Sequence, residues 1–238
     1  MSEINLCFIP HAGGSAMGYK TFKKFLHPEI NTIALELSGR GSRLSEKCFT
    51  DAHECALDLF YLNKEIFEKG SYAFFGHSLG TVISFELARI IKAKGFPEPS
   101  HIFFSGKTAP HSKPVSVIGS DLDLSDEEFL KAFSSFGTVP DVILSNDELR
   151  KMFLPIIRAD VTMADNYHYE YEGPELSCDI SVFYGKNDMC YSGQDVDKWQ
   201  ECTTGKCYSE GFEGDHFYFN NPVTKQKLCD VINRTLIG

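Results

Sequence analysis

Residues 72–80 read Tyr-Ala-Phe-Phe-Gly-His-Ser-Leu-Gly, and residues 81–89 continue Thr-Val-Ile-Ser-Phe-Glu-Leu-Ala-Arg. The apolar run at 72–75 is typical of a buried strand, and apolar residues from Leu79 onward repeat at helical spacing. A Gly-x-Ser-x-Gly segment between a strand and a helix is a nucleophile elbow, whose tight reversal strains the serine backbone and exposes its hydroxyl. The stretch therefore predicts a reactive Ser78 beside a helix start whose amides face developing negative charge.

Outward from this elbow, short apolar runs alternate with helical patterns. The strand-like runs cover residues 4–10, 31–37, 72–76, 101–106, 179–185 and 206–212. Helical spacing covers 51–67 and 79–94, and the second pattern stops at Gly95. This alternation predicts a mostly parallel, doubly wound α/β sheet, which together with the elbow indicates an α/β hydrolase. The 238 residues, 42% of them hydrophobic, suit one domain spanning 1–238.

Residues 116–172 break this alternation. Two Ser-x-x-Glu capping boxes, at Ser125 to Glu128 and at Ser145 to Glu148, predict helices where another strand and crossover would be expected. Because open α/β sheets bind ligands at the carboxyl ends of their strands, we interpret the region as a helical lid over that edge. A decorative insertion without a role in binding is the alternative.

A serine nucleophile needs a base and an acid that orients it, and in this fold they follow in the order acid, then histidine. His216 lies in a glycine-rich turn after the last strand-like run, which makes it the candidate base. Asp188 follows the run at 179–185 and is the candidate acid. Asp215 is the rival, but a side chain adjacent to His216 rarely reaches its ring nitrogen, so we expect Asp215 to be a solvated turn residue.

Residues 10–15, Pro-His-Ala-Gly-Gly-Ser, follow the first strand-like run. They resemble the loop that supplies the second oxyanion amide in this fold. Its amides would join that of Leu79. Gly13 and Gly14 allow the backbone to approach a substrate closely. The sequence lacks both the P-loop lysine and the spaced glycines of a dinucleotide fold, so we expect no cofactor.

Composition narrows the other possibilities. The net charge of −10 argues against a nucleic-acid partner. No apolar run approaches the ~18 to 20 residues of a membrane span, and the first ten residues do not resemble a signal peptide. Eight cysteines without a CxxC pair predict reduced thiols, and neither Cys202 nor Cys207 has a histidine or a second cysteine pair near it in sequence. We therefore expect a cytoplasmic protein with no metal and no membrane contact.

Several segments together resemble type II thioesterases of polyketide and nonribosomal peptide assembly lines. They are F-I-P-H-A-G-G-S-A, L-S-G-R-G-S-R, F-F-G-H-S-L-G, F-E-L-A-R, F-S-G-K-T-A-P-H, L-S-D-E-E-F-L, L-P-I-I-R-A-D, Y-G-K-N-D and G-D-H-F-Y-F. The resemblance spans residues 6 to about 220. The A-P-H, R-G-x-R and R-A-D segments discriminate best, since ordinary lipases lack them.

The resemblance implies hydrolysis of acyl thioesters on the phosphopantetheine arm of acyl or peptidyl carrier proteins, which clears stalled or misprimed groups. It also implies a helical lid at about 116–172. By position it implies Ser78 as nucleophile, His216 as base, Asp188 as orienting acid, and Leu79 and Ala12 as oxyanion amides. The family usually has proline after the triad aspartate, where this chain has Met189 and Cys190. That departure puts the rigidity of the loop in doubt.

The predicted lid helices supply apolar candidates for an acyl chamber suited to short or medium chains. These are Phe129, Phe133, Met152 and Phe153, with Phe136 and Ile157 beside them. The alternative is that they only pack the lid onto the sheet.

Charge is unevenly spread along the chain: residues 121–179 hold 14 acids and 4 bases. An acidic carrier should therefore dock on the N-terminal half, through lysines near the site. The candidates are Lys20, Lys23, Lys24, Lys107 and Lys113. Ordinary solvated lysines are the alternative. We expect the protein to be a monomer.

Two other function classes remain open at this stage. A carboxylesterase or lipase acting on oxygen esters would use the same three residues, because the elbow reports the nucleophile and not the leaving group. A non-catalytic interaction module could keep the fold, although such a protein would be expected to have lost a member of the triad.

Overall fold

The computed structural model describes residues 3–112, 124–134, 139, 141–191, 193 and 195–238. In it, six strands form one sheet in the order β2-β1-β3-β4-β5-β6, and every neighbouring pair is parallel. The strands are β1 (Ile4–Ile9), β2 (Ile30–Ala34), β3 (Tyr72–His77), β4 (His101–Ser105), β5 (Asp179–Gly185) and β6 (Cys207–Phe212). The predicted α/β hydrolase architecture with a parallel sheet is confirmed.

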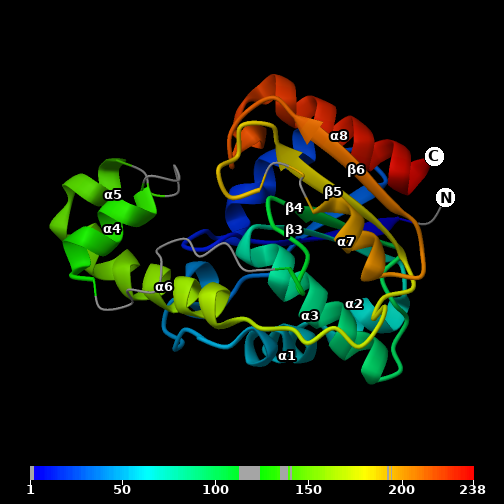
Figure 1. The fold of residues 1–238 in the computed structure, drawn as a ribbon, viewed down its shortest axis with the longest axis horizontal. Coiled ribbons are helices and arrows are strands. Elements are labelled where there is room, and N and C mark those ends of the chain that lie inside the picture. The colour runs from blue at the N-terminus through cyan, green and yellow to red at the C-terminus, as the bar shows by residue number, and fades with distance from the viewer. Residues whose placement is uncertain (1–2, 113–123, 135–138, 140, 192, 194) are drawn as a thin grey trace.

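Helices cover both faces of this sheet (Figure 1). One face packs on α1 (Ala52–Leu62), α2 (Lys64–Lys69) and α3 (Leu79–Ala93), with α7 (Val196–Glu201) near its far edge. The other packs on η1 (Ala16–Lys24), η3 (Tyr218–Asn220) and α8 (Pro222–Ile237), while the short η2 (Gly41–Arg43) follows β2. Every residue of the central strand β3 is buried. Burial on both faces explains why this strand is a continuous apolar run in the sequence.

The helical pattern at 51–67 corresponds to two helices rather than the one that we predicted. Asn63 separates α1 from α2, and its side-chain amide donates to the Leu59 carbonyl at 2.8 Å. The Asn63 backbone amide also bonds to both Leu59 and Phe60. Asparagine competes in this way with helical hydrogen bonds, which ends α1 despite the unbroken apolar spacing.

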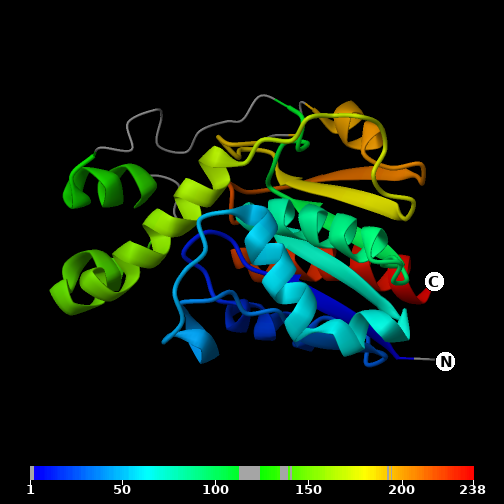
Figure 2. The ribbon, with the colours of Figure 1, turned by 90° about the horizontal axis from the view of Figure 1, so that it is seen from below.

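The described residues between β4 and β5 form three helices, α4 (Asp126–Ser134), α5 (Asp141–Ser145) and α6 (Asp147–Asn166). In both views α4, α5 and the first part of α6 extend beyond the sheet (Figure 2). The rest of the predicted insertion at 116–172 includes residues 116–123, 135–138 and 140, which lie outside the described residues.

One of the two predicted capping boxes is present. The Ser125 backbone amide donates to the Glu128 carboxylate at 3.1 Å, and the Glu128 amide donates back to the Ser125 hydroxyl at 3.4 Å. The second prediction is wrong, because Asn146 caps α6 through its side-chain oxygen, and the Ser145 hydroxyl donates instead to the Val142 carbonyl. Asparagine is as good an N-cap as serine, and it stands one residue closer to the helix.

Candidate active site

Ser78 occupies the turn between β3 and α3, with φ +55° and ψ −114°. It is the one non-glycine residue with positive φ in the described part of the chain. A β-carbon at Gly76 would lie 2.2 Å from the Gly80 carbonyl oxygen, and one at Gly80 would lie 2.2 Å from the Ile9 carbonyl oxygen. Both glycines of the elbow are therefore required by close backbone approach, and the strain is concentrated on the serine between them.

His216 and Asp188 meet across two loops that follow β6 and β5. The Nδ1 of His216 donates to Oδ2 of Asp188 at 2.8 Å, and the two residues are only 7% and 5% exposed. The loops are tied together by their backbones, since the Asn187 amide donates to the Gly214 carbonyl at 3.0 Å. Asp215 is exposed and its carboxylate accepts the Phe217 amide, so it does not contact the imidazole of its neighbour through any described bond.

Ser78 and His216 line the same small cavity, at the carboxyl edge of the sheet. Its other lining residues are His11, Ala12, Leu79, Gly106, Lys107, Thr108, Phe133, Val161, Ala164, Cys190 and Phe217. The free space amounts to about 30 Å³, roughly that of one water molecule. Phe133, Val161 and Ala164 are the part of its wall that the inserted helices contribute.

The four lid residues named from the sequence have different positions. Phe133 lines the cavity, whereas Phe129 is buried behind it and stacks on Phe133 at a ring separation of 6.3 Å. Phe153 is partly buried in the adjacent apolar cluster and outside the cavity lining. Met152 is 49% exposed and is not brought to the cavity, because it lies on another side of α6 from Val161.

Sequence reasoning missed Val161 and Ala164. A signal was available, because Ile157, Val161 and Ala164 follow one another at four- and three-residue spacing and so share one face of a helix. The predicted apolar set ends at Ile157, but α6 continues to Asn166.

A second buried carboxylate holds the loop after β1. Asp160 of α6 accepts the Gly13 amide at 2.7 Å and forms a two-pronged ion pair with Arg40, at 2.5 and 2.7 Å. Arg40 also donates to the Gly14 carbonyl at 3.3 Å. The R-G-x-R and R-A-D segments thus meet at this pair, which connects the inserted helix to the candidate oxyanion loop.

The Arg40–Asp160 pair is fully desolvated, with Asp160 at 0% and Arg40 at 5% exposure. Burial by itself lowers the pKa of Arg40, but the hydrogen bond and charge of Asp160 outweigh this effect and raise that pKa. A guanidinium and a carboxylate joined by two parallel N–H···O bonds form one of the strongest ionic contacts in proteins. The Arg40 guanidinium therefore remains charged.

Two further histidines lie near His216 and stay neutral: His77 packs against its ring, and His11 lines the same cavity. Burial, followed by the charges of His216 and Arg40, lowers the pKa of His11 to about 3. Burial also places the pKa of His77 well below its ordinary value. His77 bonds to the Ser105 hydroxyl at 2.9 Å, and its ring lies 4.7 Å from that of His216. These two rings form an uncharged wall around the candidate base.

The lysines proposed for docking differ in their exposure to solvent. Lys20, Lys23 and Lys24 are exposed on η1. Lys107 instead is half-buried and lines the cavity, and burial lowers its pKa. Lys113 lies outside the described residues.

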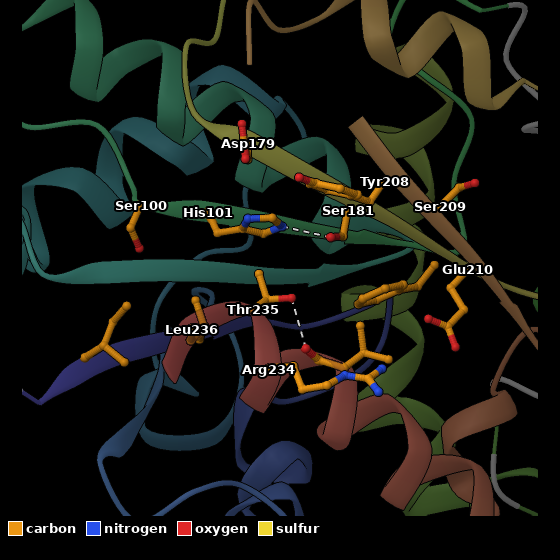
Figure 3. Close-up of a pocket in the computed structure, with 13 residues that line it drawn as sticks. Ser100, His101, Asp179, Ser181, Tyr208, Ser209, Glu210, Arg234, Thr235 and Leu236 are labelled. Atoms are coloured by element: carbon orange, nitrogen blue, oxygen red, sulfur yellow. Dashed lines mark hydrogen bonds between the residues drawn. The ribbon is translucent and has the colours of Figure 1, made fainter. Parts of the chain in front are cut away.

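A larger cavity of about 620 Å³ lies between α8 and the amino-terminal parts of β4 and β5, away from Ser78 (Figure 3). There His101 bonds to the Ser181 hydroxyl at 2.8 Å. Ser181 lies within β5, where the sheet ladder uses the backbone amides, so no helix start faces its hydroxyl. This pair lacks the oxyanion donors that a second hydrolytic site would require.

Comparison with known proteins places the chain in a family. The thioesterase domain model matches residues 4–236. The chain is 30% identical to thioesterase PikA5 of Streptomyces venezuelae over 236 residues, which cover 99% of this chain and 82% of that protein. It is 32% identical to gramicidin S biosynthesis protein GrsT of Aneurinibacillus migulanus over 218 residues, covering 91% and 83%.

Solved structures agree with these sequence matches. The type II thioesterase BorB from the borrelidin biosynthetic cluster superposes with a TM-score of 0.84 at 30% identity, covering 98% of this chain and 92% of that one. Within the described residues, no helix is long and apolar enough to cross a membrane. The match to nearly the whole chain, together with these relatives, shows that the protein is an enzyme of the thioesterase family with the α/β-hydrolase fold.

Proposed function

We propose that this thioesterase hydrolyses acyl thioesters on the phosphopantetheine arm of acyl or peptidyl carrier proteins, with Ser78 as nucleophile. The observation that carries the proposal is the buried His216–Asp188 bond of 2.8 Å, because His216 and the strained Ser78 line one cavity. The names of the relatives support the pathway: GrsT is a gramicidin S biosynthesis protein, and BorB belongs to a borrelidin cluster. A cytoplasmic location and a monomeric state are part of the same proposal.

In the first step the Ser78 oxygen attacks the thioester carbonyl carbon. Because Nδ1 of His216 carries the proton that it donates to Asp188, Nε2 has a free lone pair and takes the serine proton. Asp188 stabilises the imidazolium that results. The carbon–sulfur bond then breaks, and the imidazolium gives its proton to the departing thiolate.

Two backbone amides would bind the oxyanion of the tetrahedral intermediate. In the loop after β1, the Gly14 amide donates to the His11 carbonyl and the Gly13 amide donates to Asp160. None of the hydrogen bonds described for this loop uses the Ala12 amide. Leu79 begins α3, so its amide has no partner inside the helix. Both residues line the cavity with Ser78, which supports their assignment as the oxyanion pair.

Water completes the cycle by the reverse path. His216 takes a proton from the water molecule, the hydroxide attacks the acyl carbon, and the ester bond to Ser78 breaks. The imidazolium then returns its proton to the serine oxygen, which releases the free acid. No cofactor is needed for any of these steps.

The proposal is tested by presenting one acyl group in three forms: on a carrier protein, on N-acetylcysteamine and as an oxygen ester. Intact-protein mass spectrometry of the carrier gives the first rate, and product analysis gives the other two. We expect the carrier thioester to be cleaved fastest and Ser78→Ala to abolish all three reactions. Preference for the oxygen ester would favour a carboxylesterase, and carrier binding without cleavage would favour an interaction module.

Docking of an acidic carrier is assigned to Lys20, Lys23 and Lys24. They are exposed on the helix that directly follows the oxyanion loop, so a bound carrier would stand beside the cavity. Charge reversal of these lysines should slow cleavage of the carrier thioester and spare the small thioester, with less effect at high salt. Lys69→Glu is the matched control, since Lys69 is exposed at the end of α2, before β3 begins.

A further inference from the structure

Three side chains with different donor atoms converge beside Ser78. The carboxylate of Asp188, the thiol of Cys190 and the imidazole of His216 each offer an atom, and these atoms lie within 4.8 Å of one another. Asp188 and His216 are buried, and Cys190 is partly buried and lines the cavity. Cys190 and His216 are therefore open to an ion that enters the cavity, and Asp188 is bonded to His216.

The loop after β5 holds the thiol close to the carboxylate. The Cys190 backbone amide donates to Oδ1 of Asp188 at 2.8 Å, while Oδ2 of the same carboxylate accepts from His216. Cys190 stands two residues after Asp188 in the same loop.

We propose that Asp188, Cys190 and His216 bind Zn²⁺, and that the bound ion inhibits hydrolysis. One thiolate, one imidazole and one carboxylate form a donor set that suits Zn²⁺, with a fourth position left for water. Mg²⁺ and Ca²⁺ prefer oxygen ligands only, so neither ion fits this set. The sequence spacing did not suggest the site, because His216 is 26 residues from Cys190 and reaches it only through the folded sheet.

Inhibition would follow from the tautomer of His216, and this half of the inference rests on the proposed function. A metal on Nδ1 replaces the proton that Asp188 now accepts, so the ring proton must sit on Nε2. A protonated Nε2 cannot accept the Ser78 proton, and the nucleophile is not activated. The Cys190 thiol loses one proton to solvent when its sulfur binds the ion.

The test measures zinc binding separately from catalysis. Zn²⁺ is titrated by calorimetry into the wild type and into Ser78→Ala, Cys190→Ala and Cys202→Ala. The Cys202 variant is the matched control, because its sulfur lies 3.8 Å from Nδ1 of His111 and forms a thiol–imidazole pair elsewhere. Activity of wild type, Cys190→Ala and Cys202→Ala is followed with a chromogenic oxygen ester, since a thioester would release a thiol that itself binds zinc.

We expect one zinc ion to bind the wild type, Ser78→Ala and Cys202→Ala alike, and to bind Cys190→Ala at least about tenfold more weakly. Zinc should abolish wild-type ester hydrolysis, and Mg²⁺ should not. Equal binding to wild type and Cys190→Ala, or a loss in Cys202→Ala, would overturn the site. Binding that depends on Cys190 but leaves hydrolysis unchanged would overturn the inhibition. A wild type that hydrolyses neither the ester nor the carrier thioester without zinc, yet binds zinc through Cys190, would refute the proposed function and leave the metal site standing.

Discussion

Two buried carboxylates lie near the cavity, and they bond to different kinds of basic side chain. Asp188 bonds to an imidazole that must gain and lose a proton during the proposed reaction, so the charge of its partner changes. Asp160 bonds to Arg40, whose guanidinium is charged throughout. We propose that the first pair serves the chemistry and that the second holds the loop after β1 against α6. Breaking the first should remove activity and keep the fold, whereas breaking the second should cost stability.

The largest expected effect is on the first pair. Asp188→Asn keeps the shape of the side chain but favours the wrong tautomer of His216, and the same change in the serine protease triad lowers kcat by about 10⁴-fold. We expect a loss of that order in thioester hydrolysis, with an unchanged melting temperature. Asp215→Asn is the matched control. If Asp215→Asn were the more damaging change, the assignment of the acid would be wrong.

The second expected effect is on the free energy of unfolding. Asp160→Asn leaves the Arg40 guanidinium buried without a counter-charge, which typically costs about 3 to 5 kcal/mol. Urea unfolding measures this loss. Asp58→Asn serves as the control, because the Arg43–Asp58 pair has a similar distance of 2.7 Å but is partly exposed. Its removal should cost under about 1 kcal/mol, and equal losses in the two variants would mean that burial does not distinguish the pairs.

His101 is a buried histidine that bonds to a serine hydroxyl, and it allows a prediction of how stability depends on pH. Burial lowers the pKa of His101 to about 4 from an ordinary value of 6.5. Between these values the unfolded chain binds more protons, so the stability from the neutral ring is complete above about pH 6.5 and is lost as pH falls towards 4. His101→Gln should therefore reduce the loss of stability between pH 6.5 and 5 by about 2 kcal/mol. Urea unfolding of the variant and the wild type at pH 6.5 and at pH 5 measures this difference, and an equal loss of stability in both would contradict it.

The smallest effect concerns the wall that Asp160 helps to hold. Phe133 lines the cavity, and Phe133→Leu should enlarge it and shift the acyl-length preference towards longer chains, by about tenfold in kcat/KM between neighbouring lengths. Met152→Leu is the control because Met152 is half exposed and outside the cavity. Rates are compared across a series of acyl thioesters of N-acetylcysteamine. An identical length profile in both variants would remove Phe133 from specificity.

Local sequence patterns were enough to predict the sheet and the nucleophile elbow. The run at 179–185 coincides with β5, because a strand buried on both faces is apolar throughout and ends where glycine allows a turn. The order of Ser78, Asp188 and His216 was also readable, since in a parallel sheet loops after different strands meet at one edge. Both predictions depended on features that are contiguous in the sequence.

The contacts between distant segments were not predictable in this way. Arg40 and Asp160 are 120 residues apart, and nothing near either one indicates a buried partner. Cys190 likewise reaches His216 only because the loops after β5 and β6 are joined through their backbones. The cap of α6 shows a smaller limit: Ser145 and Asn146 are both good caps, and sequence preference alone does not choose between them.

The central claim is that Ser78 is the nucleophile, and covalent labelling tests it most directly. A fluorophosphonate is incubated with the wild type and with Ser78→Ala, and the modified peptide is identified by mass spectrometry. We predict a single label on Ser78 in the wild type and none in Ser78→Ala, with hydrolysis of the acyl thioester lost in step with labelling. A label on a cysteine, or thioester hydrolysis that survives complete labelling of Ser78, would contradict the account.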